Sequence, residues 1–143
     1  MTALFADTSF WIALSSRRDE YRARALAWSR DLTRTQASIL TTEAVLWGWM
    51  NALSDSATRR IAAAGYYRCH RDAHIEVIPF SADLVDAAMQ LYGTQHDKNW
   101  SLTDCFSFVV MEQRRLAQAL TTDHPFCQAG FEAVLLSEPQ ALV

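Results

Sequence analysis

The feature that most constrains the fold is an alternation of short apolar runs with longer stretches of helical periodicity. Five short runs are predicted strands: Thr2–Ala6, Ala37–Thr41, Ile75–Ile78, Ala117–Thr121 and Ala133–Leu136. Helical patterns separate them, at Tyr21–Arg34, Thr42–Leu53, Ser56–Arg71, Ala82–Gln95 and Leu102–Arg115. Because strands joined through whole helices need crossover connections, we predict an α/β fold with a mainly parallel sheet covered on both faces.

The composition is that of an ordered globular protein. The chain has 143 residues, of which 50% are hydrophobic and 20% charged, with 4 glycines and 3 prolines. A chain of this length can bury a substantial core, and we expect residues 1–143 to form a single domain. No apolar run approaches the ~18 residues needed to span a bilayer. The start "MTALFADTSF" lacks the basic segment of a secretory signal peptide.

Cysteine content and net charge bear on the cellular compartment and on nucleic-acid binding. Cys69, Cys105 and Cys127 are odd in number and lack C-x-x-C spacing, which favours reduced thiols in the cytoplasm over a disulfide framework. The net charge of −3 does not indicate a nucleic-acid-binding protein. It does not exclude one, because a local basic patch matters more than the total.

Four carboxylates stand at positions that a parallel sheet would bring together. Asp7 follows "ALFA", Glu43 follows "SILTT", and Asp123 follows the strand in "LAQALTTDHPF". Asp104 lies at the start of the strongly apolar helix in "WSLTDCFSFVVM". Ligands of open parallel α/β sheets bind outside the carboxyl ends of the strands. The sequence therefore predicts an acidic site at that edge.

Each of these acids also has a purely structural interpretation. Asp7 and Asp123 could be helix caps, and Glu43 could complement the positive end of its helix dipole. Ser101 and Asp104 have the spacing of a capping box. Taken singly, each position favours the structural interpretation. Taken together they do not, because capping alone gives no reason for acids to concentrate at one edge.

Converging carboxylates would need either protons or a cation. Two carboxylates about 4 Å apart repel by roughly 1 kcal/mol in bulk water and by roughly 4 kcal/mol at an effective dielectric constant of 20. Oxygen ligands without histidine or thiolate at matching positions favour Mg²⁺ or Mn²⁺ over zinc. Such ions assist phosphoryl chemistry, so the pattern indicates metal-dependent phosphodiester hydrolysis.

Four segments together resemble the PIN domain, in the form found in bacterial VapC-type toxin ribonucleases. They are "FADTSFWIAL", "ILTTEAVLWGWMN", "WSLTDCFSFVVME" and "ALTTDHPFCQAGF", and they occur in the family's order. The resemblance implies a three-layer α/β/α fold around a five-stranded, mainly parallel sheet. It also implies an endoribonuclease that requires Mg²⁺ or Mn²⁺ and cleaves single-stranded RNA, leaving a 5′-phosphate and a 3′-hydroxyl.

Carried onto this chain, the resemblance makes Asp7, Glu43, Asp104 and Asp123 the acidic quartet. Asp7, Asp104 and Asp123 would be the main metal ligands, and Glu43 would be a ligand or would orient the attacking water. Ser9 and Thr122 would supply the hydroxyls that support Asp7 and Asp123 by hydrogen bonding. The resemblance further implies a homodimer and a small antitoxin partner. The chain departs from the family most in Ser54–His74, the segment in which the family's substrate and partner determinants vary.

Other features and alternative functions carry less weight. Candidate phosphate contacts are Arg17, Arg18, Lys98 and Asn99. Cys69, His70 and His74 could be soft-metal ligands, but the chain has no second ligand pair to complete such a site.

An aspartate-nucleophile phosphatase is disfavoured, because "DTS" replaces the D-x-D that such enzymes need. A non-catalytic PIN module that binds RNA or a protein stays open as the alternative.

Overall fold

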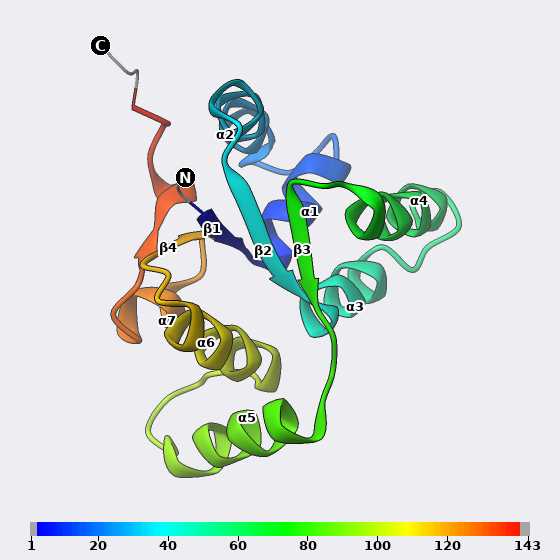
Figure 1. Cartoon of the computed structure of the whole chain (residues 1–143). Helices are drawn as coiled ribbons and strands as arrows, with labels where there is room; N and C mark the ends of the chain where they lie inside the picture. Colours follow the sequence, from blue (N-terminus) through cyan, green and yellow to red (C-terminus); the bar gives the residue numbers. More distant parts are fainter. Residues whose placement is uncertain (1–2, 141–143) are drawn as a thin grey trace.

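The computed structural model describes residues 3–140, which form a five-stranded sheet flanked by helices (Figure 1). The sheet order is β3-β2-β1-β4-β5, and every neighbouring pair is parallel. The strands are β1 (Ala3–Ala6), β2 (Ser38–Thr42), β3 (Ile75–Ile78), β4 (Gln118–Leu120) and β5 (Glu132–Ala133). The predicted fold class is confirmed. Thr2, the expected first residue of β1, lies outside the described residues.

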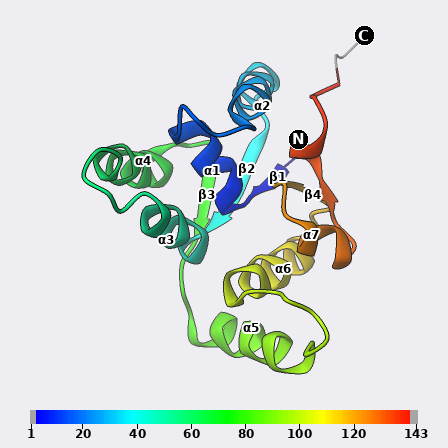
Figure 2. The same ribbon diagram turned by 180° about the vertical axis from the view of Figure 1, so that it is seen from behind.

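The helices occupy the connections between strands, as crossovers require. They are α1 (Thr8–Ser15), α2 (Arg22–Thr35), α3 (Glu43–Ala52), α4 (Arg59–Arg71), α5 (Ala82–Thr94), α6 (Leu102–Arg114) and α7 (His124–Gln128). Views from opposite sides show α5 beside α6, and α3 beside α4, in separate parts of the molecule (Figures 1 and 2). Among the described residues, no helix is long and apolar enough to cross a membrane.

The central strand explains why the sheet is buried on both faces. Leu4, Phe5 and Ala6 are consecutive apolar residues of β1, and all three are buried. Successive side chains of a strand point to opposite faces, so a continuous apolar run needs cover on each side. Helices supply that cover, and the core includes Phe10 from α1 and Met111 from α6. The end of β1 is thereby fixed between two helical layers.

The predicted strand Ala133–Leu136 was largely wrong. Only Glu132–Ala133 pairs with β4, and Val134–Leu136 forms a 3₁₀ turn. Val134 and Leu135 are both buried in the core. An edge strand would direct these neighbours to opposite faces, whereas the turn directs both inward. The short helix α7 was also not predicted, although Pro125 in its first turn is favourable there.

Helix α4 approaches α3 unusually closely at Gly65. An ideal Cβ built on Gly65 would lie 2.2 Å from Cη2 of Trp49 on α3. The Trp49 ring stacks on Trp11 at a centroid distance of 5.6 Å, and its Nε1 donates a hydrogen bond to Oγ of Ser15. The ring therefore has little freedom to move away. Only glycine at position 65 allows this spacing between the two helices.

We predict that Gly65→Ala destabilises the protein by about 1–3 kcal/mol, because the added methyl group overpacks the Trp49 ring. The matched control is Gly93→Ala in α5, where an added Cβ meets no atom within 4 Å. That control should be neutral, or more stable by up to about 1 kcal/mol through helix propensity. Denaturant unfolding measures both changes. Equal effects at the two positions would contradict the close approach.

Candidate metal centre

Three of the four predicted acids converge at the carboxyl edge of the sheet. Asp7, Asp104 and Asp123 each offer a carboxylate oxygen, and these oxygens all lie within 4.8 Å of one another. Asp7 follows β1 and Asp123 follows β4, which are neighbouring parallel strands. Asp104 reaches the same point from the first turn of α6. The topology of the sheet therefore brings together side chains that are far apart in the sequence.

The carboxylate of Asp7 is not a helix cap. Asp7 occupies the N-cap position of α1, but its side chain makes no capping hydrogen bond to that helix's second or third amide. It is instead 2% exposed and accepts a hydrogen bond of 2.8 Å from Oγ1 of Thr121. Oγ of Ser9 is 3.5 Å from the same oxygen, Oδ2. Asp123 likewise stands at the N-cap of α7 without a capping bond from its side chain.

The hydroxyl beside Asp7 belongs to Thr121, the residue before the predicted Thr122. Thr121 is fully buried, and its Oγ1 also accepts a hydrogen bond of 3.0 Å from the backbone amide of Asp123. Thr122 takes part through its backbone, whose amide donates to Oγ of Ser9 at 3.3 Å. Neighbouring side chains of an extended segment point to opposite sides, so only one of the two threonines can face β1.

Asp104 combines the structural and the functional interpretation. Its backbone amide donates to Oγ of Ser101 at 3.0 Å, and the Ser101 amide donates to Oδ2 of Asp104 at 3.1 Å. This is the predicted capping box of α6. The same hydrogen bonds fix the direction of the Asp104 side chain. A helix cap therefore positions one carboxylate of the cluster.

The cluster carries uncompensated negative charge. Burial raises the pKa of Asp7 to about 7, and the charges of Asp123 and Asp104 contribute to the rise, against the hydrogen bonds from Thr121 and the Thr8 backbone. Burial also raises the pKa of Asp104, and the charge of Asp123 adds to that effect. Within residues 3–140, none of the ion pairs involves these three aspartates.

The three aspartates fit a small hard cation. Mg²⁺ holds oxygen ligands at about 2.1 Å in octahedral geometry, which places neighbouring ligand oxygens roughly 3–4 Å apart. The spacing of at most 4.8 Å in the cluster needs only a small adjustment to meet this geometry. A divalent ion would also relieve the repulsion that raises the pKa values of Asp7 and Asp104. The oxygen-only donor set does not distinguish Mg²⁺ from Mn²⁺.

Glu43 belongs to a different set of contacts. It is the first residue of α3, at the same edge of the sheet, but its carboxylate does not join the three aspartates. Oε1 of Glu43 lies 2.8 Å from Nε2 of His70, and the hydroxyl of Tyr66 lies 3.1 and 3.0 Å from Oε1 and Oε2. The metal-ligand role predicted for Glu43 stays a prediction.

The other predicted contacts lie on the surface. Arg17 and Arg18 are exposed in the connection between α1 and α2, and Asn99 is exposed between α5 and α6. Lys98 pairs with Asp97 at 3.6 Å. Their roles in phosphate binding stay predictions. The soft-metal site considered for Cys69, His70 and His74 is disfavoured, because the Cys69 thiol is buried and burial raises its pKa to about 11.

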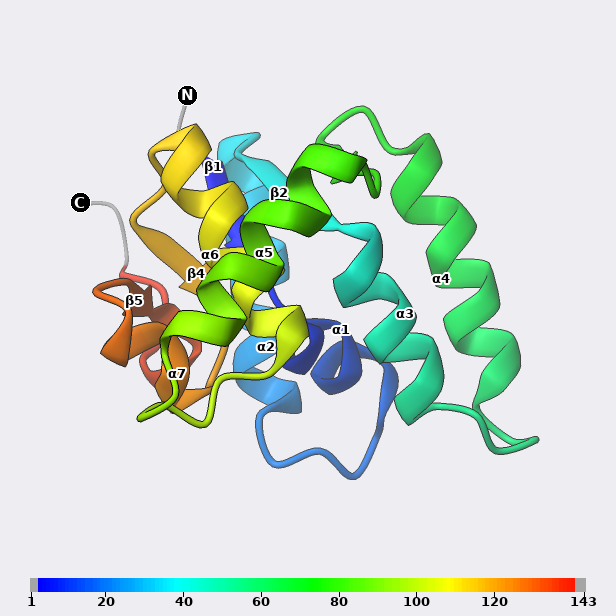
Figure 3. The same ribbon diagram turned by 90° about the horizontal axis from the view of Figure 1, so that it is seen from below.

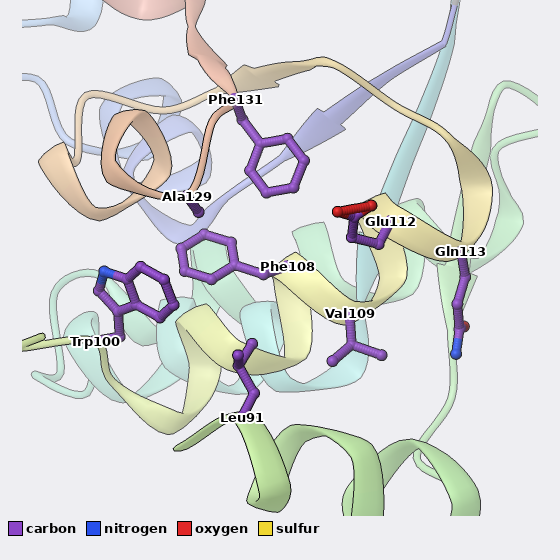
Figure 4. Close-up of a pocket in the computed structure, with 8 residues that line it drawn as sticks. All are labelled: Leu91, Trp100, Phe108, Val109, Glu112, Gln113, Ala129 and Phe131. Atoms are coloured by element: carbon purple, nitrogen blue, oxygen red, sulfur yellow. The ribbon is translucent and has the colours of Figure 1, made fainter. Parts of the chain in front are cut away.

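A separate apolar pocket lies between α5, α6 and the segment after α7 (Figure 4). Its volume is about 340 Å³, and its walls include Leu91, Trp100, Phe108 and Phe131. None of the three aspartates lines it. Glu112 is the only charged residue in its wall, so the pocket is unsuited to phosphate. The aspartate cluster is therefore the better candidate for an active site.

Comparison with known proteins places this geometry in a family. The PIN domain family matches residues 4–132. The chain belongs to the PIN domain family. A relative named 23S rRNA-specific endonuclease VapC20, from two strains of Mycobacterium tuberculosis, is 29% identical over 132 residues. This alignment covers 92% of the chain and 97% of the relative. The predicted family resemblance is confirmed.

A solved structure shows the same likeness in three dimensions. The crystal structure of Mycobacterium tuberculosis VapC20, described as a sarcin–ricin loop cleaving toxin, superimposes with a TM-score of 0.79 at 26% identity. The match covers 92% of this chain and 98% of that one. The chain is thus a PIN domain with an acidic triad, and it resembles VapC toxins over nearly its whole length.

Replacing Asp7 by Asn should stabilise the cation-free protein at neutral pH. The pKa of Asp7 rises from 3.8 in the unfolded chain to about 7 in the fold, so within this window the native state keeps a proton that the unfolded chain releases. The free energy of unfolding of the wild type therefore falls as pH rises from about 4 to 7. Asp7→Asn removes that loss, which should amount to roughly 2–4 kcal/mol at about pH 8.

The measurement is denaturant unfolding in EDTA at about pH 5 and about pH 8, where the gain should be smaller at the lower pH. A variant less stable than the wild type at the higher pH would contradict the assigned burial of charge.

Thr121→Val should destabilise the protein by about 1–3 kcal/mol, because it removes the hydroxyl that donates to Asp7 and accepts from the Asp123 amide. Thr122→Val is the matched control, since the Thr122 backbone makes its contact with Ser9. Unfolding curves of both variants at one pH test the assignment. A larger loss at position 122 would reverse it.

Proposed function

We propose that this protein is an endoribonuclease that requires a divalent cation and cleaves phosphodiester bonds of single-stranded RNA. The observation that carries the proposal is the convergence of Asp7, Asp104 and Asp123 at the carboxyl edge of a parallel sheet, in a chain of the PIN family. Similarity to an endonuclease named as specific for 23S rRNA supports RNA as the substrate.

The hydrogen bonds and the exposure of the three aspartates suggest a different role for each. Asp7, Asp104 and Asp123 would hold Mg²⁺ or Mn²⁺, which when bound neutralises phosphate charge and makes a water more acidic. Thr121 and the capping box keep Asp7 and Asp104 in fixed directions. Asp123 is the exposed member, and its carboxylate is open to accept a proton from the attacking water. In-line attack on the phosphate then leaves a 5′-phosphate and a 3′-hydroxyl.

The substrate would approach over flanking polar loops. Arg17 and Arg18 follow α1, and Lys98 with Asn99 precedes α6, whose first turn carries Asp104. We propose these four residues as contacts to RNA phosphates, which would add affinity without base preference. Ribosomal RNA is the first substrate to test, because the relative VapC20 is named for it.

An exposed apolar face supports a homodimer. Val85, Met89 and Tyr92 lie on one side of α5 and are 37%, 47% and 51% exposed. Trp47 packs edge-on against Phe80 nearby in the fold, and both are also exposed. We propose that a second copy covers this face. By analogy with VapC toxins, we also propose a cognate antitoxin partner and action in the cytoplasm.

Asp104→Asn should lower the rate of RNA cleavage in Mg²⁺ or Mn²⁺ by more than about 100-fold, because a lost ligand costs more than a lost supporting contact. The amide keeps an oxygen for the capping box, so the fold should persist. Asp86→Asn, an exposed change on α5, is the matched control and should cleave at the wild-type rate. The assay uses purified protein with ribosomal and messenger RNA, followed by mapping of 5′ ends.

The competing function is a non-catalytic PIN module that binds RNA or a protein. It predicts that the wild type and Asp104→Asn leave RNA equally intact at every divalent cation concentration. A wild type that produces 5′-phosphate ends, and a variant that does not, would exclude this alternative.

A further inference from the structure

Glu43 sits in a small polar cluster that the proposed chemistry of the three aspartates does not use. Its carboxylate accepts hydrogen bonds from the Tyr66 hydroxyl, and its Oε1 lies 2.8 Å from Nε2 of His70. The side chain of Glu43 is 13% exposed and that of His70 is 36% exposed. Burial, followed by the bond to Glu43, raises the pKa of the Tyr66 hydroxyl. The carboxylate is therefore held from two directions near the surface.

Two packed helices build this cluster. Thr42 caps α3 by accepting a hydrogen bond of 3.0 Å from the Val45 amide, which places Glu43 in the first turn. Tyr66 and His70 are one turn apart on α4, so they share a face, and their rings meet at a centroid distance of 4.6 Å. Figure 3 shows α3 and α4 side by side. The close approach at Gly65 puts Tyr66 within reach of α3.

The cluster adjoins the aspartates through the sheet. Asp7 follows β1 and Glu43 follows β2, and these neighbouring strands are in register up to Phe5 and Leu40. Oγ1 of Thr41 donates a hydrogen bond of 2.8 Å to the carbonyl of Ala6, directly before Asp7. The two acids consequently leave the sheet at the same edge. Glu43 therefore lies at the edge of the sheet that carries the aspartate cluster, without belonging to the cluster.

The contacts of Glu43 give it a separate electrostatic status. The raised pKa values of Asp7 and Asp104 arise from burial and from neighbouring aspartates rather than from Glu43. The Tyr66 hydroxyl donates to the Glu43 carboxylate, and Nε2 of His70 lies 2.8 Å from Oε1, so both side chains stabilise the Glu43 charge locally. They also fix a side chain that otherwise rotates about three bonds. A carboxylate fixed in this way can orient a water or a ribose hydroxyl beside the cluster.

We propose that Tyr66 and His70 are positioning residues of the RNA cleavage site, which act by holding the Glu43 carboxylate at the rim of the aspartate cluster. This inference rests on the proposed nuclease function. It assigns a role in catalysis to α4, a helix that supplies no carboxylate to the cluster. A purely structural pin between α3 and α4 is the competing interpretation, and the two differ in how the variants combine.

The test is a double-mutant cycle with RNA cleavage as the readout. His70→Ala and Tyr66→Phe should each lower kcat by about 10-fold, with KM for RNA unchanged, as expected for the loss of a contact that supports a catalytic side chain. Glu43→Gln should lower kcat at least as much. Adding His70→Ala to Glu43→Gln should cause no further loss, because His70 acts only through the carboxylate.

Two further variants separate positioning from folding. His70→Gln keeps an N–H donor on a flexible side chain and should recover part of the lost rate. His74→Ala is the matched control, since His74 is exposed and its backbone, rather than its ring, makes its contacts. Nitrogen-15 NMR of the imidazole gives a readout independent of activity. The signal of a hydrogen-bonded Nε2–H should be present in the wild type and lost in Glu43→Gln.

The outcomes distinguish this inference from the proposed function. If the wild type cleaves RNA and Asp104→Asn does not, but His70→Ala and Tyr66→Phe cleave at the wild-type rate, the positioning role is refuted and the nuclease stands. Multiplying losses in His70→Ala/Glu43→Gln would also refute it, in favour of the structural pin. A wild type that does not cleave RNA would refute both proposals.

Discussion

The site depends on one unfavourable arrangement, a carboxylate held out of water at the end of the central strand. Asp7 is 2% exposed and has two acidic neighbours within reach of the same ion. A lone buried charge is expensive, and hydrogen bonds from Thr121 and the Thr8 backbone offset only part of that cost. A divalent cation, which the proposed function requires, would relieve the remaining electrostatic repulsion. Under that proposal, stability and function oppose each other at Asp7.

The rest of the architecture holds that carboxylate in place. Parallel pairing of β1 with both β2 and β4 directs three chain segments to one edge. Thr121 bridges Asp7 and the Asp123 backbone, so the two strands are tied at the site as well as along the sheet. Thr41 adds a third tie from β2 to Ala6. The short hydroxyl side chains of Thr41 and Thr121 thus hold the strand ends together at the aspartate cluster.

The sequence predicted the fold well because its strongest signals were local and repeated. Apolar runs separated by helical patterns indicate a parallel sheet. In such a sheet, acids that directly follow strands lie at one edge, so their convergence could be predicted. Finer features depended on which way a side chain points. "TT" before Asp123 contains two hydroxyls, and only the structure shows that Thr121 faces Asp7. Val134 and Leu135 were predicted as strand residues because an apolar run of four residues does not distinguish a strand from a 3₁₀ turn that buries both side chains.

Glu43 marks the same limit for the site. Its position after β2 predicted the correct edge, but its side chain contacts Tyr66 and His70, which lie more than twenty residues later in the sequence. They belong to α4, which lies beside α3 (Figure 3). Contacts between distant segments have no signature in local periodicity. Ser101 and Asp104 show the opposite case, since a short spacing correctly predicted the capping box, while the family resemblance predicted the second role of Asp104 in the acidic cluster.

The presence of Asp104 in both the capping box and the aspartate cluster has a mechanical consequence. Asp104 lies in the first turn of α6 and also contributes to the aspartate cluster, so one carboxylate of the cluster is held by a thirteen-residue helix packed on α5. If the first turn of α6 frays, the Asp104 carboxylate also loses its fixed direction. Anything that loosens the start of α6, even from its distant face, would alter the acidic edge of the sheet without touching a single acidic residue.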